Sequence, residues 1–278
     1  MSILLLTVII LIGAYFAGLL GSLTGLGGGF VIIPLLTLGL HVNIHYAIGA
    51  SLVSVIATSS GSAAAYVKEG ITNIRIGMFL EIATTIGAMA GAMLALHVQT
   101  HFIAILFGLI LAFSAIMSFA KKVQTVYAEG SPLANQLRLN GTYPTQDGIV
   151  KYGVRNVGGG FFMMIFAGII SGLLGIGSGA LKVIAMDTIM RIPFKVSTTT
   201  SNFMIGVTAA ASAVVYLQRG YIDPGLSMPV VIGVLLGALS GSKILVHTKS
   251  SGWLRWVFTI VVGVLAVQMI YNGITGKI

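Results

Sequence analysis

Apolar residues fill long stretches of this chain, separated by short polar segments, and they do not alternate with polar residues as in a half-buried strand. Such stretches predict membrane-spanning helices, because a helix of about 20 apolar residues crosses the hydrocarbon core and satisfies its own backbone groups. We expect long spans at 2–23, 46–67, 74–97, 101–120, 157–174, 196–218, 224–247 and 253–273, and shorter apolar pieces at 30–40 and 180–190.

The pattern of spans occurs twice along the chain. When the sequence is shifted by 150 residues, 17–94 aligns with 167–244 without a gap, and 17 of the 78 pairs are identical. The identities include the glycines of two turns. Internal duplication of this kind is common in secondary transporters. We therefore predict an all-α polytopic membrane protein with a first repeat at 1–120, a polar loop at 121–156 and a second repeat at 157–278.

The distribution of basic residues predicts how the repeats are oriented. If each short piece crosses the membrane, five segments form each half, and eleven basic residues lie inside against two outside. If the short pieces are re-entrant instead, the division is nine against four. The positive-inside rule favours the first arrangement, which is an inverted repeat of five plus five segments with a cytoplasmic loop. Gly, Asn and β-branched residues around Pro144 in that loop predict a small β-hairpin, with an ordered linker as the alternative.

Composition narrows the class of protein further. Hydrophobic residues make up 56% of the chain and charged residues 8%, which fits an integral protein of the plasma (inner) membrane. The net charge of +9 is explained by topology-setting loops, so we expect no nucleic-acid partner. Cysteine is absent, which excludes disulfides and thiolate metal sites. We expect no metal or other cofactor, and we assign the four loop-edge histidines to the membrane interface.

Two glycine turns are the first candidates for a binding site. Each precedes a short piece whose first backbone N–H groups are free, and such a helix start attracts anions. Close helix packing is the alternative explanation for these glycines. A dinucleotide motif is excluded, because the turns lie in membrane spans and Phe30 occupies the last glycine position in the first turn. The candidate residues are Gly25, Gly27, Gly28 and Gly29 in the first turn and Gly175, Gly177, Ser178 and Gly179 in the second.

Lys182 lies three positions after the second turn in an otherwise apolar piece, where a charge is costly and marks a functional site by default. It is a candidate ligand for an anion, with a structural pair to Asp187 or snorkelling as alternatives. Hydroxyl and amide groups of Ser51, Ser201 and Asn202 are further candidates, because they bind anion oxygens without a full counter-charge. We interpret Ser197 as a helix cap.

Two acidic residues are candidates for carrying a coupling proton, since burial raises the pKa of a carboxyl group. Glu81 lies within a span, with a pair to Arg75 at the membrane boundary as the alternative, and Asp187 lies in the second short piece. The chain offers no paired acidic dyad, no His-Glu-x-x-His motif and no convincing Ser–Lys pair. We therefore expect no enzymatic activity.

Residues 17–36, Ala-Gly-Leu-Leu-Gly-Ser-Leu-Thr-Gly-Leu-Gly-Gly-Gly-Phe-Val-Ile-Ile-Pro-Leu-Leu, resemble the signature of the TauE/SafE family of sulfite and organosulfonate exporters. Residues 167–187 resemble its second copy, although Ser178 replaces a glycine and Ile184 stands where Pro34 would pair. The resemblance covers nearly all of the chain except the loop 121–156. It implies transport of sulfur-containing or small organic anions, without fixing the substrate or the direction.

The residues and the resemblance together predict a secondary transporter of small anions that works by alternating access, driven by a proton gradient, an ion gradient or the substrate's own gradient. An anion channel of the same fold is the alternative. A membrane scaffold that recruits a partner through the loop 121–156 is a further one.

Overall fold

The computed structural model describes residues 3–24, 27–119, 127, 129–145, 148–247 and 252–277. It is mostly helical, and six of the described helices are long and apolar enough to cross a membrane. The elements of the first half are α1 (Ile3–Thr24), α2 (Gly29–Pro34), the π-helix η1 (Leu35–Gly39), α3 (Ile44–Lys68), α4 (Ile74–Ala95) and α5 (Thr100–Phe119). The connecting loop contains α6 (Pro132–Gln136), β1 (Gly141–Thr145) and β2 (Gly148–Tyr152). The second half consists of α7 (Val157–Leu174), α8 (Gly179–Ile184), the π-helix η2 (Ala185–Ile189), α9 (Phe194–Gln218), α10 (Pro224–His247) and α11 (Gly252–Ile274).

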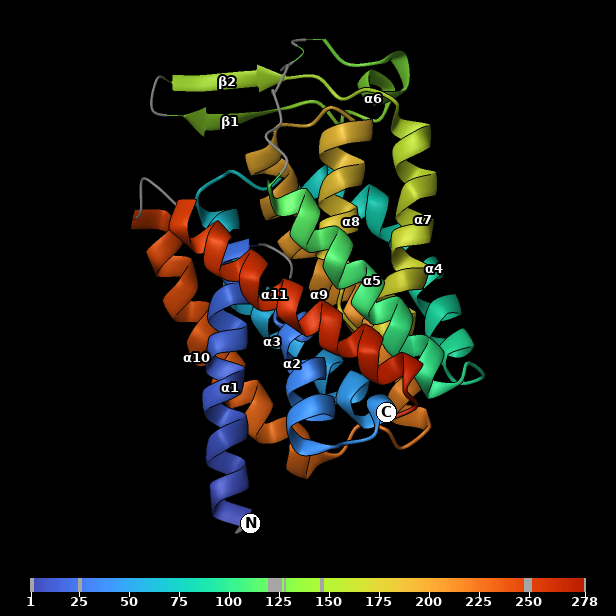
Figure 1. The fold of residues 1–278 in the computed structure, drawn as a ribbon. Coiled ribbons are helices and arrows are strands. Elements are labelled where there is room, and N and C mark those ends of the chain that lie inside the picture. The colour runs from blue at the N-terminus through green and yellow to red at the C-terminus, as the bar shows by residue number, and fades with distance from the viewer. Residues whose placement is uncertain are drawn as a thin grey trace.

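Equivalent elements of the two halves are separated by the same 150 residues that relate the sequences. The elements α2, η1 and α3 become α8, η2 and α9 at this interval, with identical lengths. The halves run in opposite directions, because α7 begins beside the β-hairpin whereas α1 begins at the far end of the molecule (Figure 1). Helices pair across the halves: α1 packs on α10, α4 on α7, α3 on α9 and α5 on α11.

Glycines allow the outer pairs to approach closely. A Cβ atom at Gly18 in α1 would lie 2.2 Å from the carbonyl oxygen of Val234 in α10. The equivalent contact in the other half is nearly identical, since a Cβ at Gly168 in α7 would lie 2.3 Å from the carbonyl oxygen of Thr84 in α4. In lipid, helices associate through such close backbone packing of small residues. These glycines are therefore explained by packing.

The second short piece returns the chain to the side from which α7 entered. The backbone N–H of Arg155, just before α7, donates to the carbonyl of Met190, just after η2, over 3.0 Å. The chain thus passes through the bundle along α7, turns at 175–178 and comes back along α8 and η2, so that α9 begins at the same end as α7. A re-entrant piece on the far side would have left α9 to begin at the opposite end.

The connecting loop forms an antiparallel hairpin in which Gly141 pairs with Tyr152 and Thr145 with Gly148. Asn73, which caps α4, donates from Nδ2 to the Tyr152 hydroxyl over 2.8 Å and to the Leu139 carbonyl over 3.0 Å. Burial of the Tyr152 side chain raises the pKa of its hydroxyl to about 12, although the hydrogen bond from Asn73 acts to lower that pKa. The hairpin is therefore anchored to the ends of the helices, at one end of the molecule (Figure 1).

Candidate functional site

The two glycine turns meet between α3 and α9. Gly27 and Gly177 both adopt left-handed backbone conformations, with φ angles of +80° and +70°. A Cβ at either glycine would fall against Val55 of α3 and Ile205 of α9, which are themselves equivalent positions of the two halves. The turns thus come together where the halves join. Gly25 lies outside the described residues, and Gly28 stands as the N-cap of α2.

Serine hydroxyls fix the carbonyl groups around the turns. Ser51 donates from Oγ to the Gly175 carbonyl over 2.7 Å, and Gly29 packs against the same Ser51 side chain. Ser201, the equivalent of Ser51, donates to the Gly179 carbonyl over 3.2 Å. Both serines are fully buried. Their protons are therefore used to hold the turns in this conformation.

Two other candidates keep unused polar atoms. The Ser178 hydroxyl and the Asn202 Nδ2 atom are buried, and neither has a hydrogen-bond partner in the described part of the chain. The backbone carbonyl of Asn202 accepts a hydrogen bond from Ser59 Oγ over 2.5 Å. The same Oγ accepts from the backbone N–H of Gly206 over 3.1 Å. Buried polar groups normally find partners, so these two are open to an additional ligand.

Lys182 is the most unusual residue of the site, because its side chain is fully buried in α8. Its ammonium group donates to Thr208 Oγ1 on α9, and its Nζ lies 3.9 Å from Glu81 Oε2 on α4. Thr208 in turn donates to Glu81 Oε1 over 2.6 Å. Helices from both halves thus supply one ionic cluster, made of Glu81, Lys182 and Thr208. Lys182 does not snorkel to the surface, because its side chain is buried. Glu81 does not form a boundary pair with Arg75, because Arg75 is exposed and Glu81 faces Lys182 instead.

The ionic cluster has no counterpart in the other half. At the 150-residue interval Lys182 corresponds to Ile32 and Glu81 to Val231, so the charges are not repeated. Of the three residues only Thr208 is repeated, as Thr58. An apolar version of this contact is therefore compatible with the fold. Because buried charges are costly, their presence on one side only indicates a role beyond packing.

Asp187 is buried on η2, and the salt bridge found for Lys182 in the described structure is to Glu81. The interpretation of Ser197 as a helix cap is wrong. Helix α9 begins earlier, with Pro193 at its N-cap, and Ser197 lies inside the first turns, donating from Oγ to the Ile192 carbonyl over 3.2 Å. Proline fixes the backbone before the helix, which moves the start upstream of the serine.

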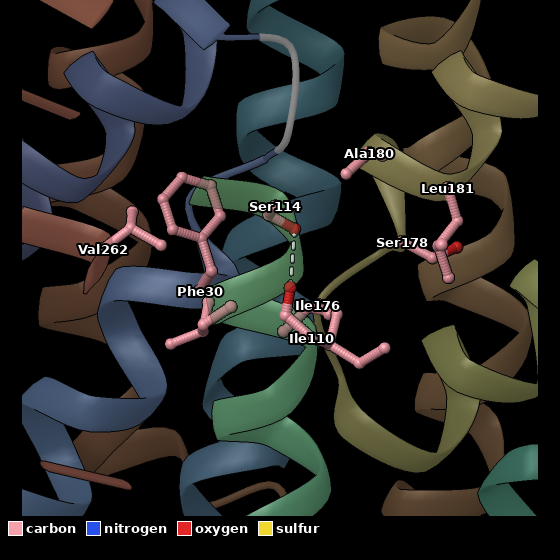
Figure 2. A pocket seen from close by; sticks show the side chains of 10 residues that line it. Phe30, Ile110, Ser114, Ile176, Ser178, Ala180, Leu181 and Val262 are labelled. Atoms are coloured by element: carbon pink, nitrogen blue, oxygen red, sulfur yellow. Dashed lines mark hydrogen bonds between the residues drawn. The ribbon is translucent and has the colours of Figure 1, made fainter. Parts of the chain in front are cut away.

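A pocket lies beside the second turn. Phe30, Ser114, Ser178, Leu181 and Val262 are among its lining residues, contributed by α2, α5, the turn, α8 and α11 (Figure 2). The empty space in and at the mouth of this pocket is about 340 Å³, open solvent included, and its walls are mostly apolar. Lys182 does not line it. The pocket therefore reaches the second turn but not the ammonium group.

Thr208 was not among the residues expected at the site. The only signal in the sequence was its identity with Thr58 in the repeat. That signal does not distinguish a threonine in a site from one that bonds to its own helix, as Thr58 does to the Ser54 carbonyl over 2.8 Å.

Comparison with known proteins bears directly on this architecture. The family model described as sulfite exporter TauE/SafE matches residues 10–269. The chain belongs to this family. It is 28% identical to the probable membrane transporter protein YunE of Bacillus subtilis, over 96% of this chain and 98% of that protein. It is also 27% identical to the probable membrane transporter protein YdhB of the same organism, over 84% of this chain and 89% of that one.

A probable membrane transporter protein of Xylella fastidiosa is 25% identical over 96% of each chain. No solved structure gives a significant match. The family, the relatives and the apolar helices identify an integral membrane protein of a transporter family. Nothing in these relationships indicates catalytic activity.

Proposed function

We propose that this TauE/SafE protein is a secondary transporter that carries small anions across the plasma membrane by alternating access. The anions are sulfur-containing species such as sulfite, thiosulfate and organosulfonates, or small organic anions. The observation that carries the proposal is the buried ammonium group of Lys182 beside the second glycine turn. A buried cation that one half contains and the other lacks is suited to binding an anion.

The unused polar groups near the turn support an anionic substrate. Ser178 and Asn202 offer a hydroxyl and an amide that have no partners among the described residues. Such groups bind the oxygens of an oxyanion without a full counter-charge, and Lys182 supplies a cation on the helix that follows the turn. Because Lys182 is sealed from the pocket, we assign the structure to an occluded state, and the anion reaches the lysine when α8 separates from α4 and α9.

The inverted halves supply the motion that alternating access needs. The turns meet at Val55 and Ile205, on equivalent helices that run in opposite directions. Rocking of one half against the other about this contact would open the site to each side in turn. The basic residues favour a cytoplasmic position for the loop 121–156.

A thermal-unfolding screen of the detergent-purified protein tests the proposal. The anions are sulfite, sulfate, thiosulfate, methanesulfonate and acetate, because a ligand that binds the native state raises its apparent melting temperature. We expect sulfur oxyanions to stabilise the wild type and the control Lys195→Ala, whose lysine is exposed on α9, but not Lys182→Ala. Equal stabilisation of the Lys182 variant would exclude the lysine from the site. Stabilisation by none of the anions would reject an anionic substrate.

A carrier also differs from a channel in its kinetics. In proteoliposomes loaded with the stabilising anion, a carrier shows uptake of labelled anion that is accelerated by unlabelled anion on the opposite side and saturates with concentration. Uptake that grows linearly and is unaffected by internal anion would contradict alternating access.

A further inference from the structure

The contact between Glu81 and Lys182 leaves hydrogen-bonding capacity on both sides. An ammonium group carries three N–H donors, and the partner found for Lys182 in the described structure is the single hydroxyl of Thr208. Glu81 accepts from Thr208 and from Thr85 at Oε1, over 2.6 and 3.3 Å. Its other oxygen, Oε2, is buried and accepts no hydrogen bond from any described residue. The two charges balance each other without being locked together.

An arriving anion would change this balance of charge. Glu81 and Lys182 together are neutral, so an anion that binds the ammonium group leaves one uncompensated negative charge in a buried place. Such a charge is strongly disfavoured, and a carboxylate in this position binds a proton instead. Proton uptake at Glu81 restores neutrality without moving any other charged group.

The described elements around Glu81 provide no other buried cation. Helix α7, which packs on α4, has no charged side chain between its ends. On α4 itself Arg75 is exposed, and on α9 Lys195 is exposed at the first turn. Asp187 on η2 is the remaining buried acid nearby in the chain, and it adds negative charge. Among these residues, Lys182 is the cation that faces Glu81.

We propose that Glu81 is the resident counter-anion of Lys182, that the transported anion takes its place, and that Glu81 binds one proton from water as the anion arrives. The anion then crosses together with a proton, so that a monovalent anion moves without net charge. Thr208 is a positioning residue, since it holds the carboxylate through Oε1 and leaves Oε2 free for the proton. This inference rests on the proposed function and adds the coupling ion to it.

The test measures proton uptake on anion binding. Two monovalent anions, methanesulfonate and ethanesulfonate, are titrated into detergent-purified protein by calorimetry, in Tris and in imidazole buffer, because the difference in heat between buffers counts the protons taken up. Both anions keep their charge over the working pH range. We expect about one proton per anion for the wild type, and an affinity that rises up to about tenfold for each pH unit lowered wherever one proton is taken up per anion.

The decisive variant is Glu81→Gln, which resembles the protonated carboxyl in shape. It should bind the anion at least as tightly as the wild type does at low pH, take up no proton and lose the pH dependence. Glu69→Gln, the same change at an exposed position, should behave as the wild type does. If the role of Glu81 were purely structural, Glu81→Gln would bind the anion more weakly than the wild type does.

Several results would overturn the inference. Anion binding by the wild type without proton uptake would do so whether or not the variant folds. Proton uptake that persists in Glu81→Gln would do so as well, and its loss in Asp187→Asn instead would assign the proton to Asp187. Failure of the wild type to bind either anion at any pH would refute the proposed function itself, so the two failures are distinguishable.

Discussion

The Ser51 hydroxyl donates a hydrogen bond of 2.7 Å to the Gly175 carbonyl and so joins α3 of the first half to the glycine turn of the second. Ser51→Ala leaves that carbonyl buried without its partner, which costs about 1–3 kcal/mol. We expect a lower apparent melting temperature in detergent. Ser60→Ala is the matched control, because Ser60 is exposed and bonds only to its own helix, at the Ile56 carbonyl. Equal melting of the two variants would show that the bond between the halves contributes nothing.

The paired glycine contacts predict equal damage in the two halves. An added methyl group at Gly18 or Gly168 would meet a backbone carbonyl oxygen at 2.2 or 2.3 Å, so the packed helices must separate. We expect Gly18→Ala and Gly168→Ala each to destabilise the protein by about 1–3 kcal/mol, as other overpacked contacts do. Gly263→Ala, where a Cβ would meet nothing within 4 Å, should not lower the melting temperature. Loss in only one of the two variants would argue against equivalent helix contacts.

Much of this architecture follows from the sequence because the duplicated glycines keep their spacing. An interval of 150 residues predicts both turns, the short pieces and the order of helices. Gly18 and Gly168 serve a close helix approach, and Gly27 and Gly177 take left-handed backbone conformations, so the same residue type is needed in both halves. Lys182 is also evident from the sequence, because a charge in an apolar segment is conspicuous. Its partner is not. Glu81 lies in the other half, and whether it meets Lys182 or Arg75 depends on how α4 packs against α9, which no local pattern records.

The same limit of local sequence patterns explains why the roles of Thr208 and Ser197 were not predicted. A threonine inside a helix usually bonds to its own backbone. The one hydroxyl proton of Thr208 has two acceptors within reach, the Met204 carbonyl at 3.0 Å and Glu81 Oε1 at 2.6 Å. The second contact depends on the neighbouring helix. For Ser197 the choice between a cap and an interior position depends on the start of α9, and helix ends are the least predictable boundaries.

The burial of Tyr152 predicts a pH-dependent attachment of the hairpin. Burial raises the pKa of Tyr152 from 10.0 to about 12, so the folded protein retains the phenolic proton that the unfolded chain releases above pH 10. The stability from this neutral tyrosine is complete below about pH 10 and is lost as the pH rises toward 12. Tyr152→Phe removes the proton and the hydrogen bond from Asn73, which costs about 1 kcal/mol at pH 7.

The measurement compares unfolding of the wild type and Tyr152→Phe at pH 8 and pH 11. The wild type should lose more stability than the variant between these values. Tyr143→Phe is the control, since Tyr143 lies in the same hairpin and is only half-buried. Equal losses in all three proteins would mean that Tyr152 ionises as an exposed tyrosine does.

Equivalent positions at the ends of α3 and α9 should lie on opposite sides of the membrane. Lys68 ends α3 next to the segment that binds the hairpin through Asn73, whereas Gln218 ends α9 near Tyr221, whose ring stacks on His45 at the start of α3 with centroids 5.0 Å apart. Because the chain has no cysteine, Lys68→Cys and Gln218→Cys each introduce a single exposed thiol. With the basic loops inside, a membrane-impermeant maleimide should label Gln218→Cys in intact cells and Lys68→Cys only after the membrane is opened. Labelling of both variants in intact cells would place the two ends on one side and reject inverted insertion of the halves.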